Sequence, residues 1–446
     1  MISRRVFLQT TAAVSAATLV SSMPALAGSA RQYPVFPDAD ARWPKTWDAA
    51  IEVLGGNIRK VPDFAKPVLV EGAVYPGVWQ ECAPQEGLVY GQLARFLPRT
   101  EGQPAPLEIA RNNHQAFFAL QKPDGQLPAA VKMSGLGYGQ IQMVVPIAAT
   151  AWDLVQITHD EQFLAEAYAA CSRWDAWLRQ YRDTRKTGLV EGFCVYDTGH
   201  DNSPRWAGVP QRCPNGDAHF YDKNIKGLPW LSPDLSASVY GARVALVAMA
   251  HALGKPAEAA RWQEDAEKIR TLIIDRLYDP QDAAFYDLDA DNHFVRVRSD
   301  VISRVLGEHV LKLEHAKDRA IFEAVWSRQI HNPKAFWATY PLTSVAQDDP
   351  HFVRPIPRNS WGGASQALTA LRVPRWMSHY GKQAEQRELM LQWCKAISRE
   401  TEFRQQMDPQ TGEFTRIDPS GYSPAALVYL DFMVRLAEKP HAGSAR

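Results

Sequence analysis

The stretch DLSASVYGARVAL, residues 234–246, opens the segment that decides the fold class. It begins with Asp234 at a helix N-cap position and the segment ends at Gly254, a residue that commonly follows a helix. Pro256 then stands at a helix-start position, and apolar residues spaced three or four apart continue to Leu277. The two segments therefore predict a helical hairpin.

Helical patterning of the same kind recurs in pairs along the chain. The further predicted helices lie near 44–60, 107–120, 144–158, 161–183, 299–328 (a pair), 361–380, 383–400 and 424–437. Strand-like alternation is nearly absent, apart from short pieces at 284–287 and 293–295. The sequence therefore predicts an all-α protein.

The domain organisation follows from the distribution of helix breakers. Residues 28–42 are Pro-rich and aperiodic, which is typical of a linker. No Gly/Ser-rich hinge interrupts the chain after residue 43, so residues 43–440 are predicted to form a single domain. Paired helices that alternate with long polar-aromatic loops favour a closed ring of hairpins whose loops converge at one end.

The first 27 residues have the three parts of a twin-arginine signal peptide. Arg4 and Arg5 stand in the sequence SRRVFLQ, a weakly apolar run without acids follows, and Ala25-Leu26-Ala27 supplies the cleavage signal. We expect the twin-arginine export machinery to deliver the folded protein to a bacterial periplasm. No later stretch reaches about 18 uninterrupted apolar residues, so no membrane span is expected in the mature chain.

The composition excludes some classes of partner and leaves others open. The formal net charge is zero, so the chain has no basic footprint for nucleic acid. Fourteen Trp residues suit burial in a core and equally suit stacking on sugar rings. The five cysteines have no C-x-x-C spacing. A disulfide between Cys194 and Cys213 and a set of buried free thiols both fit the sequence.

No cofactor or metal is expected. The chain has no Gly-rich phosphate loop and no H-E-x-x-H motif. Residues 287–298 resemble a calcium loop only superficially, because Asn292 stands where glycine is needed and Arg298 where glutamate is needed. We interpret the acids of this segment as a solvated turn.

The loop YDTGHDNSPRW, residues 196–206, combines two acids, an imidazole, a guanidinium and an indole. It is too polar for a core segment and too aromatic for a linker, so its composition favours a pocket for a polar ligand. An apolar indole such as Trp206 beside Asp201 would raise the pKa of that carboxyl. The alternative is that Asp201 caps a turn before Pro204.

Residues 197–206 resemble the loop of glycoside hydrolase family 63, and of the related trehalases, in which Glu-Ser-Gly-x-Asp-x-Ser-x-Arg-Trp carries the general acid. The resemblance extends over about residues 75–435 and includes the mannosylglycerate-hydrolase-like members. It implies an (α/α)6 toroid, hydrolysis of an α-glycosidic bond with inversion, and Asp201 as general acid.

Two departures from the family pattern concern the mechanism. The family base is a glutamate in the context Phe-x-Glu-Tyr-Tyr-Asp-Pro-x-Thr-Gly, but this chain has Gln405 at that position. An amide cannot accept the proton. The family sequence Trp-Arg-Gly-Pro-Val-Trp becomes WGGASQ from Trp361 onward, so an arginine is also missing. For the base, Glu413 is our first choice and Glu81 the second, although each acid also fits a solvated loop or an ion pair.

The remaining candidates are residues that would contact a carbohydrate substrate. Arg205 and Asp197 suit sugar hydroxyls but also an internal ion pair, the tryptophans suit stacking but also core packing, and His200 suits a spacer as well as a participant. The candidates are Trp79, Glu81, Gln140, Gln142, Asp197, Arg205, Trp206, Trp361 and Gln405.

The sequence thus predicts a glycoside hydrolase and leaves two alternatives. A polysaccharide lyase on a similar toroid would use a Tyr or His base near an arginine. A sugar-binding protein that has lost catalysis is directly motivated by Gln405.

Overall fold

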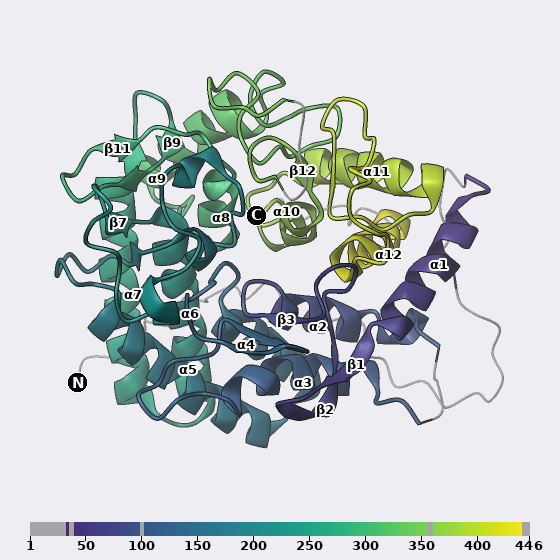
Figure 1. The fold of residues 1–446 in the computed structure, drawn as a ribbon, viewed down its shortest axis with the longest axis horizontal. Coiled ribbons are helices and arrows are strands. Elements are labelled where there is room, and N and C mark those ends of the chain that lie inside the picture. The colour runs from purple at the N-terminus through teal and green to yellow at the C-terminus, as the bar shows by residue number, and fades with distance from the viewer. Residues whose placement is uncertain (1–32, 35–39, 99–101, 355–359, 439–446) are drawn as a thin grey trace, which may run out of the picture.

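The computed structural model describes residues 33–34, 40–98, 102–354 and 360–438 of the 446-residue chain. The predicted signal peptide and most of the predicted linker lie outside the described residues. In the described part, twelve α-helices follow one another around a ring (Figure 1). Odd-numbered helices bury one face and even-numbered helices are buried on most sides, so the two sets form an outer and an inner layer.

The outer helices are amphipathic. In α7, for example, Trp262, Ala266, Ile269 and Ile273 are buried at spacings of three or four residues. This spacing is why the sequence alone predicts these helices well. The outer helices are α1 (Trp43–Gly56), α3 (Pro106–Phe118), α5 (Glu161–Tyr181), α7 (Pro256–Leu277), α9 (Ala316–Val325) and α11 (Gln383–Glu400).

The inner helices are α2 (Ala83–Gln92), α4 (Ile147–Thr158), α6 (Pro233–Ala252), α8 (Val301–Gly307), α10 (Ala367–Arg372) and α12 (Ser423–Ala437). Small residues allow them to pack closely against their outer partners. A Cβ atom on Gly87 of α2 would lie only 2.8 Å from Cβ of Asn113 in α3. Because such helices are buried on all sides, their sequences lack a polar face.

The inner helices close into a ring. Helix α2 contacts α4, α4 contacts α6, and α6 contacts α8, while α10 contacts α12 and α12 returns to α2. Thr369 of α10 donates its hydroxyl to Oδ2 of Asp300, the residue before α8, at 2.9 Å, which joins the two remaining neighbours. The prediction of an all-α toroid of helical hairpins is confirmed.

The strands are short and antiparallel. Strand β1 pairs with β2, β3 with β4 and β4 with β5, and the order of the four-stranded sheet is β11-β10-β7-β6. Their bounds are β1 (Ile58–Val61), β2 (Phe64–Leu69), β3 (Gly77–Trp79), β4 (Ala130–Lys132), β5 (Gly135–Gly137), β6 (Glu191–Gly192), β7 (Trp230–Leu231), β8 (Tyr278–Asp279), β9 (Ala284–Phe285), β10 (Asp287–Leu288), β11 (Phe294–Val295), β12 (Ser365–Gln366) and β13 (Gln406–Met407).

One segment differs from its sequence-based interpretation. No helix is predicted between residues 60 and 107, yet α2 begins at Ala83. The reason is that this inner helix is buried throughout its first nine residues, including Gln85 and Glu86, so it has no apolar and polar faces to detect. The hairpin that decided the fold class is confirmed as α6 and α7.

Helix α6 is long and apolar enough to span a membrane by length and composition. However, 67% of its apolar window is buried inside the ring, where α6 contacts α4, α5, α7 and α8. The high hydropathy of α6 therefore reflects its burial in the inner layer of the ring.

Candidate active site

The segments that precede the inner helices meet at one end of the ring. Trp361, which lies before α10, donates its backbone N–H to the carbonyl oxygen of Asp201 at 3.1 Å. Tyr75, before α2, donates its hydroxyl to Oε1 of Gln405, before α12, at 3.0 Å. The loop of residues 196–206, which leads towards α6, is thus held among segments from across the ring.

Asp197 anchors the start of this loop from inside the protein. Its carboxylate pairs with Arg182, the residue after α5, at 2.5 Å, and both side chains are fully buried. The backbone N–H groups of Ile141, Phe193 and Cys194 also donate to it. These contacts favour the alternative that Asp197 braces the loop over the prediction that it binds substrate.

Arg205 anchors the end of the loop in the same way. Its guanidinium pairs with Asp234 at the start of α6 (2.7 Å) and with Asp287 of β10 (2.6 Å), and all three side chains are at most 3% exposed. These contacts favour an internal ion pair for Arg205 over the predicted substrate contact. The alternative of an internal ion pair holds, but with these partners and not with Asp197.

His200 is a buried link in this network. Arg205 donates to Nδ1 of His200 at 3.0 Å, so Nδ1 is an acceptor and the proton resides on Nε2. Nε2 donates to Asp300, before α8, at 2.6 Å. Burial and the nearby Arg304 charge lower the pKa of His200 to about 4. His200 is therefore a neutral support for the neighbouring Asp201.

Two of the tryptophans predicted to stack on sugar are core residues. Trp206 is 2% exposed, stacks on Trp230 (ring centroids 4.6 Å apart) and donates its indole N–H to Thr198. Trp361 is also 2% exposed and packs between His200 and Arg304. Their burial favours the alternative of core packing over stacking on a sugar for both tryptophans.

Asp201 differs from the buried Asp197, His200 and Arg205 because it is partly exposed. Its charge raises the pKa of Tyr196, of Tyr75 and of the buried Glu71, although burial is the larger cause in each. Asp201 therefore lies within electrostatic reach of groups before α2 and within its own loop.

Tyr75 and Trp79 form an aromatic surface near Gln405. Both are partly exposed, and their rings meet edge to face with centroids 5.6 Å apart. Gln405 itself is 9% exposed and accepts the Tyr75 hydroxyl. Sequence reasoning found Trp79, the last residue of β3, but missed Tyr75, which lies two residues before that strand.

Glu81 touches the loop directly. A Cβ atom on Gly199 would lie 1.5 Å from Oε2 of Glu81, so the glycine makes room for the carboxylate. Gln142 donates a hydrogen bond to Glu81 and accepts one from Gln140 (2.9 Å). All three polar side chains are buried and lie near the loop. This position fits residues that contact a substrate and equally fits residues that support those that do.

Two buried arginines decide the electrostatics around Glu81. Burial raises the pKa of Glu81, and the charges of Arg372 and Arg304 limit this rise. Burial and the charges of Glu86 and Glu81 raise the pKa of Glu71 well above its usual value. Both acids are therefore shifted towards the protonated form, and Glu81 is the one with cationic neighbours that oppose the shift. Nothing in the sequence pattern around Arg304 or Arg372 predicts that these arginines lie near Glu81.

Glu413 does not belong to this group. It is exposed in the turn after β13, where its backbone carbonyl accepts from Asp408 and its N–H donates to Thr411. The structure thus places Glu413, the first choice for the base, in an exposed turn rather than among the buried residues around Glu81.

A cavity of about 790 Å³ opens elsewhere, between α5, α6 and α7. It shares only Arg182 with the anchors described above, and neither Asp201 nor Glu81 lines it. The cavity therefore lies in a different region of the molecule from the candidate site at residues 196–206.

Comparison with known proteins identifies the family. The model of the mannosylglycerate hydrolase MGH1-like glycoside hydrolase domain matches residues 101–424. No curated protein sequence matches the chain.

Among solved structures, the family 63 mannosylglycerate hydrolase of Thermus thermophilus with Tris is 20% identical, with a TM-score of 0.65 over 86% of this chain and 99% of that one. Its complex with glucose is 19% identical, with a TM-score of 0.64 over the same shares. Neutral trehalase Nth1 of Saccharomyces cerevisiae is 13% identical, with a TM-score of 0.59 over 83% of this chain and 75% of that one. These likenesses confirm the (α/α)6 fold. The family match replaces the lyase alternative: this chain is a glycoside hydrolase and belongs to the mannosylglycerate hydrolase MGH1-like family.

Proposed function

We propose that this enzyme hydrolyses an α-glycosidic bond in a small glycoside or oligosaccharide with inversion, and that Asp201 is the general acid. The observation that carries the proposal is the contrast within one loop. Asp197, His200 and Arg205 are buried and fully engaged, whereas Asp201 is partly exposed. A loop held so firmly around one accessible carboxyl supports a role for that carboxyl in chemistry.

For the base we propose Glu81 in place of Glu413. Glu81 lies against Gly199, two residues before Asp201. Burial raises the pKa of Glu81 on balance, and the charges of Arg372 and Arg304 limit that rise. A base must be ionised when it acts, so these two arginines are the groups that support this role. Gln405, at the position of the family base, has an amide and would orient a water or a hydroxyl instead.

The reaction would proceed in one displacement. Asp201 donates its proton to the glycosidic oxygen as the bond to the anomeric carbon breaks. Glu81 removes a proton from a water molecule that attacks the same carbon from the opposite face. Inverting enzymes keep the two carboxyl groups about 6.5–9.5 Å apart to leave room for this water.

A carbohydrate substrate is supported by the exposed aromatic surface of Tyr75 and Trp79, since such rings stack on the apolar faces of sugars. The related Thermus enzyme binds glucose and is a mannosylglycerate hydrolase. α-Glucosides, α-mannosides and mannosylglycerate are therefore the first compounds to offer.

The test compares variants on the best of these substrates. Loss of a general acid or base costs about 10²–10⁴-fold in rate. We expect Asp201→Asn and Glu81→Gln each to lose that much kcat, and Glu413→Gln to keep the wild-type value as a matched surface control. NMR of the first product should show the inverted anomer. Full activity in Asp201→Asn, or a loss confined to Glu413→Gln, would refute the assignment.

The second candidate is a sugar-binding protein without catalysis, which Gln405 favours. It predicts that the wild type binds but does not cleave any offered glycoside, and that Gln405→Glu gains hydrolysis. Binding by calorimetry and product formation by chromatography separate the two candidates.

We also propose export through the twin-arginine pathway to the periplasm, supported by residues 1–27. The protein recovered from periplasmic extracts should begin at Gly28, and replacement of Arg4 and Arg5 by lysine should retain it in the cytoplasm.

A further inference from the structure

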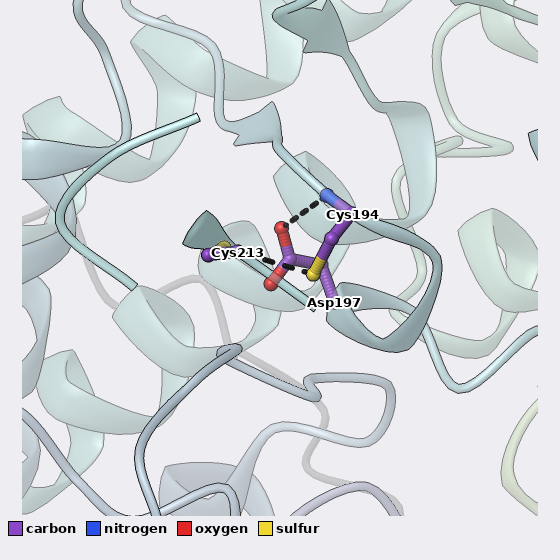
Figure 2. Close-up of side chains that lie close together, drawn as sticks. All are labelled: Cys194, Asp197 and Cys213. Atoms are coloured by element: carbon purple, nitrogen blue, oxygen red, sulfur yellow. Dashed lines mark hydrogen bonds between the residues drawn. The ribbon is translucent and has the colours of Figure 1, made fainter. Parts of the chain in front are cut away.

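Two cysteine side chains meet beneath the catalytic loop. Sγ of Cys194 and Sγ of Cys213 lie 3.7 Å apart, and the carboxylate of Asp197 lies beside them (Figure 2). Both cysteines are buried thiols, at 0% and 3% exposure.

The backbone holds the two cysteines in this position. The N–H of Val195 donates to the carbonyl oxygen of Pro210 at 3.0 Å, and that of Tyr196 donates to the carbonyl oxygen of Gln211 at 3.1 Å. Residues 194–196 and 210–213 therefore run side by side, at the base of the excursion that carries Asp201.

We propose that Cys194 and Cys213 form a disulfide that closes the chain into a ring around residues 195–212, which contain the whole catalytic loop. An S–S bond of about 2.05 Å needs the sulfurs to approach by about 1.7 Å, which side-chain rotation on two neighbouring segments supplies. The bond would restrain the unfolded loop and preserve the position of Asp201. This inference does not depend on which glycoside is cleaved.

A metal ion fits the same three residues less well. Both oxygens of Asp197 are already occupied by Arg182 and by backbone N–H groups. Arg182 also donates to Sγ of Cys213 at 3.7 Å, so a fixed cation stands where a metal would have to bind. The positive charge of Arg182 beside the sulfur therefore disfavours a metal ion, and a disulfide fits the two cysteines better.

The bond would form by exchange with a small or protein disulfide. Cys213, whose sulfur faces the Arg182 guanidinium, attacks one sulfur of the oxidant as a thiolate and releases the other as a thiol. Burial raises the pKa of the Cys194 thiol, so it reacts second. It gives up its proton and displaces the oxidant's remaining sulfur from Cys213. Two protein thiols are oxidised and one disulfide is reduced to two thiols.

The test uses the purified full-length chain, incubated with glutathione disulfide or with dithiothreitol. After denaturation and alkylation without reductant, we expect the oxidised protein to have three modified cysteines, Cys82, Cys171 and Cys394, and a linked peptide pair that contains Cys194 and Cys213. The oxidised sample should melt about 3 °C above the reduced one. The Cys194→Ala/Cys213→Ala variant should have the same melting temperature in both buffers. Because one variant is compared between two buffers, the effect of the alanine substitutions on stability cancels.

Five alkylated cysteines in the oxidised sample would overturn the proposal. So would a stable glutathione adduct on Cys213 without the linked pair, or a different linked pair. One zinc ion per chain in the reduced protein, lost in Cys213→Ala, would assign the three residues to a metal instead. The Cys171→Ala variant is the matched control, because Cys171 is equally buried and lies in α5.

Discussion

The imidazole of His200 lies between an arginine donor and an aspartate acceptor, and this arrangement keeps it neutral. Its pKa in the folded protein is about 4, below the value of about 6.5 in an unfolded chain. Because the folded pKa is lowered, the neutral form stabilises the fold fully above pH 6.5. That stability, about 3 kcal/mol, is lost as the pH falls from 6.5 to 4.

His200→Gln tests this account, because a glutamine amide can donate to Asp300 and accept from Arg205 without titrating. We expect the free energy of unfolding in urea to fall less steeply between pH 6.5 and 4 in the variant than in the wild type, by about 3 kcal/mol over the range. His114 titrates in the same direction in both proteins, since its pKa is also about 4. Identical pH profiles would mean that His200 is not the neutral link.

Gly199 has two reasons to be a glycine, and a matched variant separates them. Its φ is +62°, and a Cβ would meet Oε2 of Glu81. Gly208 in the same region has φ +79° with nothing within 4 Å of a Cβ. We expect Gly208→Ala to cost about 1 kcal/mol of stability and no activity. Gly199→Ala should also lower kcat/KM about 100-fold, because it displaces Glu81. Equal kcat/KM in the two variants would argue against a role for Glu81.

Residue types alone could not distinguish Asp201, the proposed general acid, from the residues that support its loop. Asp197, Arg205 and Asp201 all suit sugar binding by chemistry, and the motif resemblance singled out Asp201. The partners that bury the other two, Arg182 and Asp287, are 15 and 82 residues away in sequence. The folded ring brings these partners to the loop. The sequence pattern alone therefore could not predict which residues pair with Asp197 and Arg205.

Among the structural elements, the loop of residues 196–206 depends on the start of α6 and on β10. Arg205 connects it to Asp234 and Asp287, all in the interior. Arg205→Met would leave two carboxylates buried without that partner, so we expect a loss of about 3–5 kcal/mol in the free energy of unfolding. Lys268→Ala breaks an exposed pair with Glu264 in α7 and should cost about 0.5 kcal/mol or less. Both values come from urea denaturation. A similar small loss in both variants would show that the buried network is not what holds the loop.

The sequence predicts most helices, including the inner helices α4, α6 and α12, and the surroundings of α2 explain why that helix was missed. Helices α7 and α11 begin and end at the predicted residues, because each has one buried face. Helix α2 was missed, since it is enclosed by α3, α4 and α12 and carries glycines where α3 approaches. Apolar residues recur with helical periodicity when one face of a helix meets solvent. The periodicity therefore does not reveal a helix, such as α2, that has no solvent-exposed face.

At the scale of the whole molecule, the ring closes where the last helix meets the first ones. Helix α12 packs on α1, α2 and α10, and the Tyr429 hydroxyl donates to the carbonyl oxygen of Trp43 at 3.0 Å. Residues 386 positions apart are therefore part of one packed core. The catalytic loop, by way of Asp300, Asp234 and Trp361, is attached to several sides of this ring at once.

A closed ring should unfold as one unit, as the prediction of a single domain over residues 43–440 requires. Leu246 in α6 and Leu430 in α12 are both fully buried on different parts of the ring. Each change to alanine should cost about 2–5 kcal/mol. Because no part can lose its neighbours independently, we expect both variants to lower the midpoint of the same single transition. Far-ultraviolet circular dichroism and tryptophan fluorescence in urea should report coincident curves for both. A second transition, displaced by Leu430→Ala but not by Leu246→Ala, would show that the chain consists of two separately folding units.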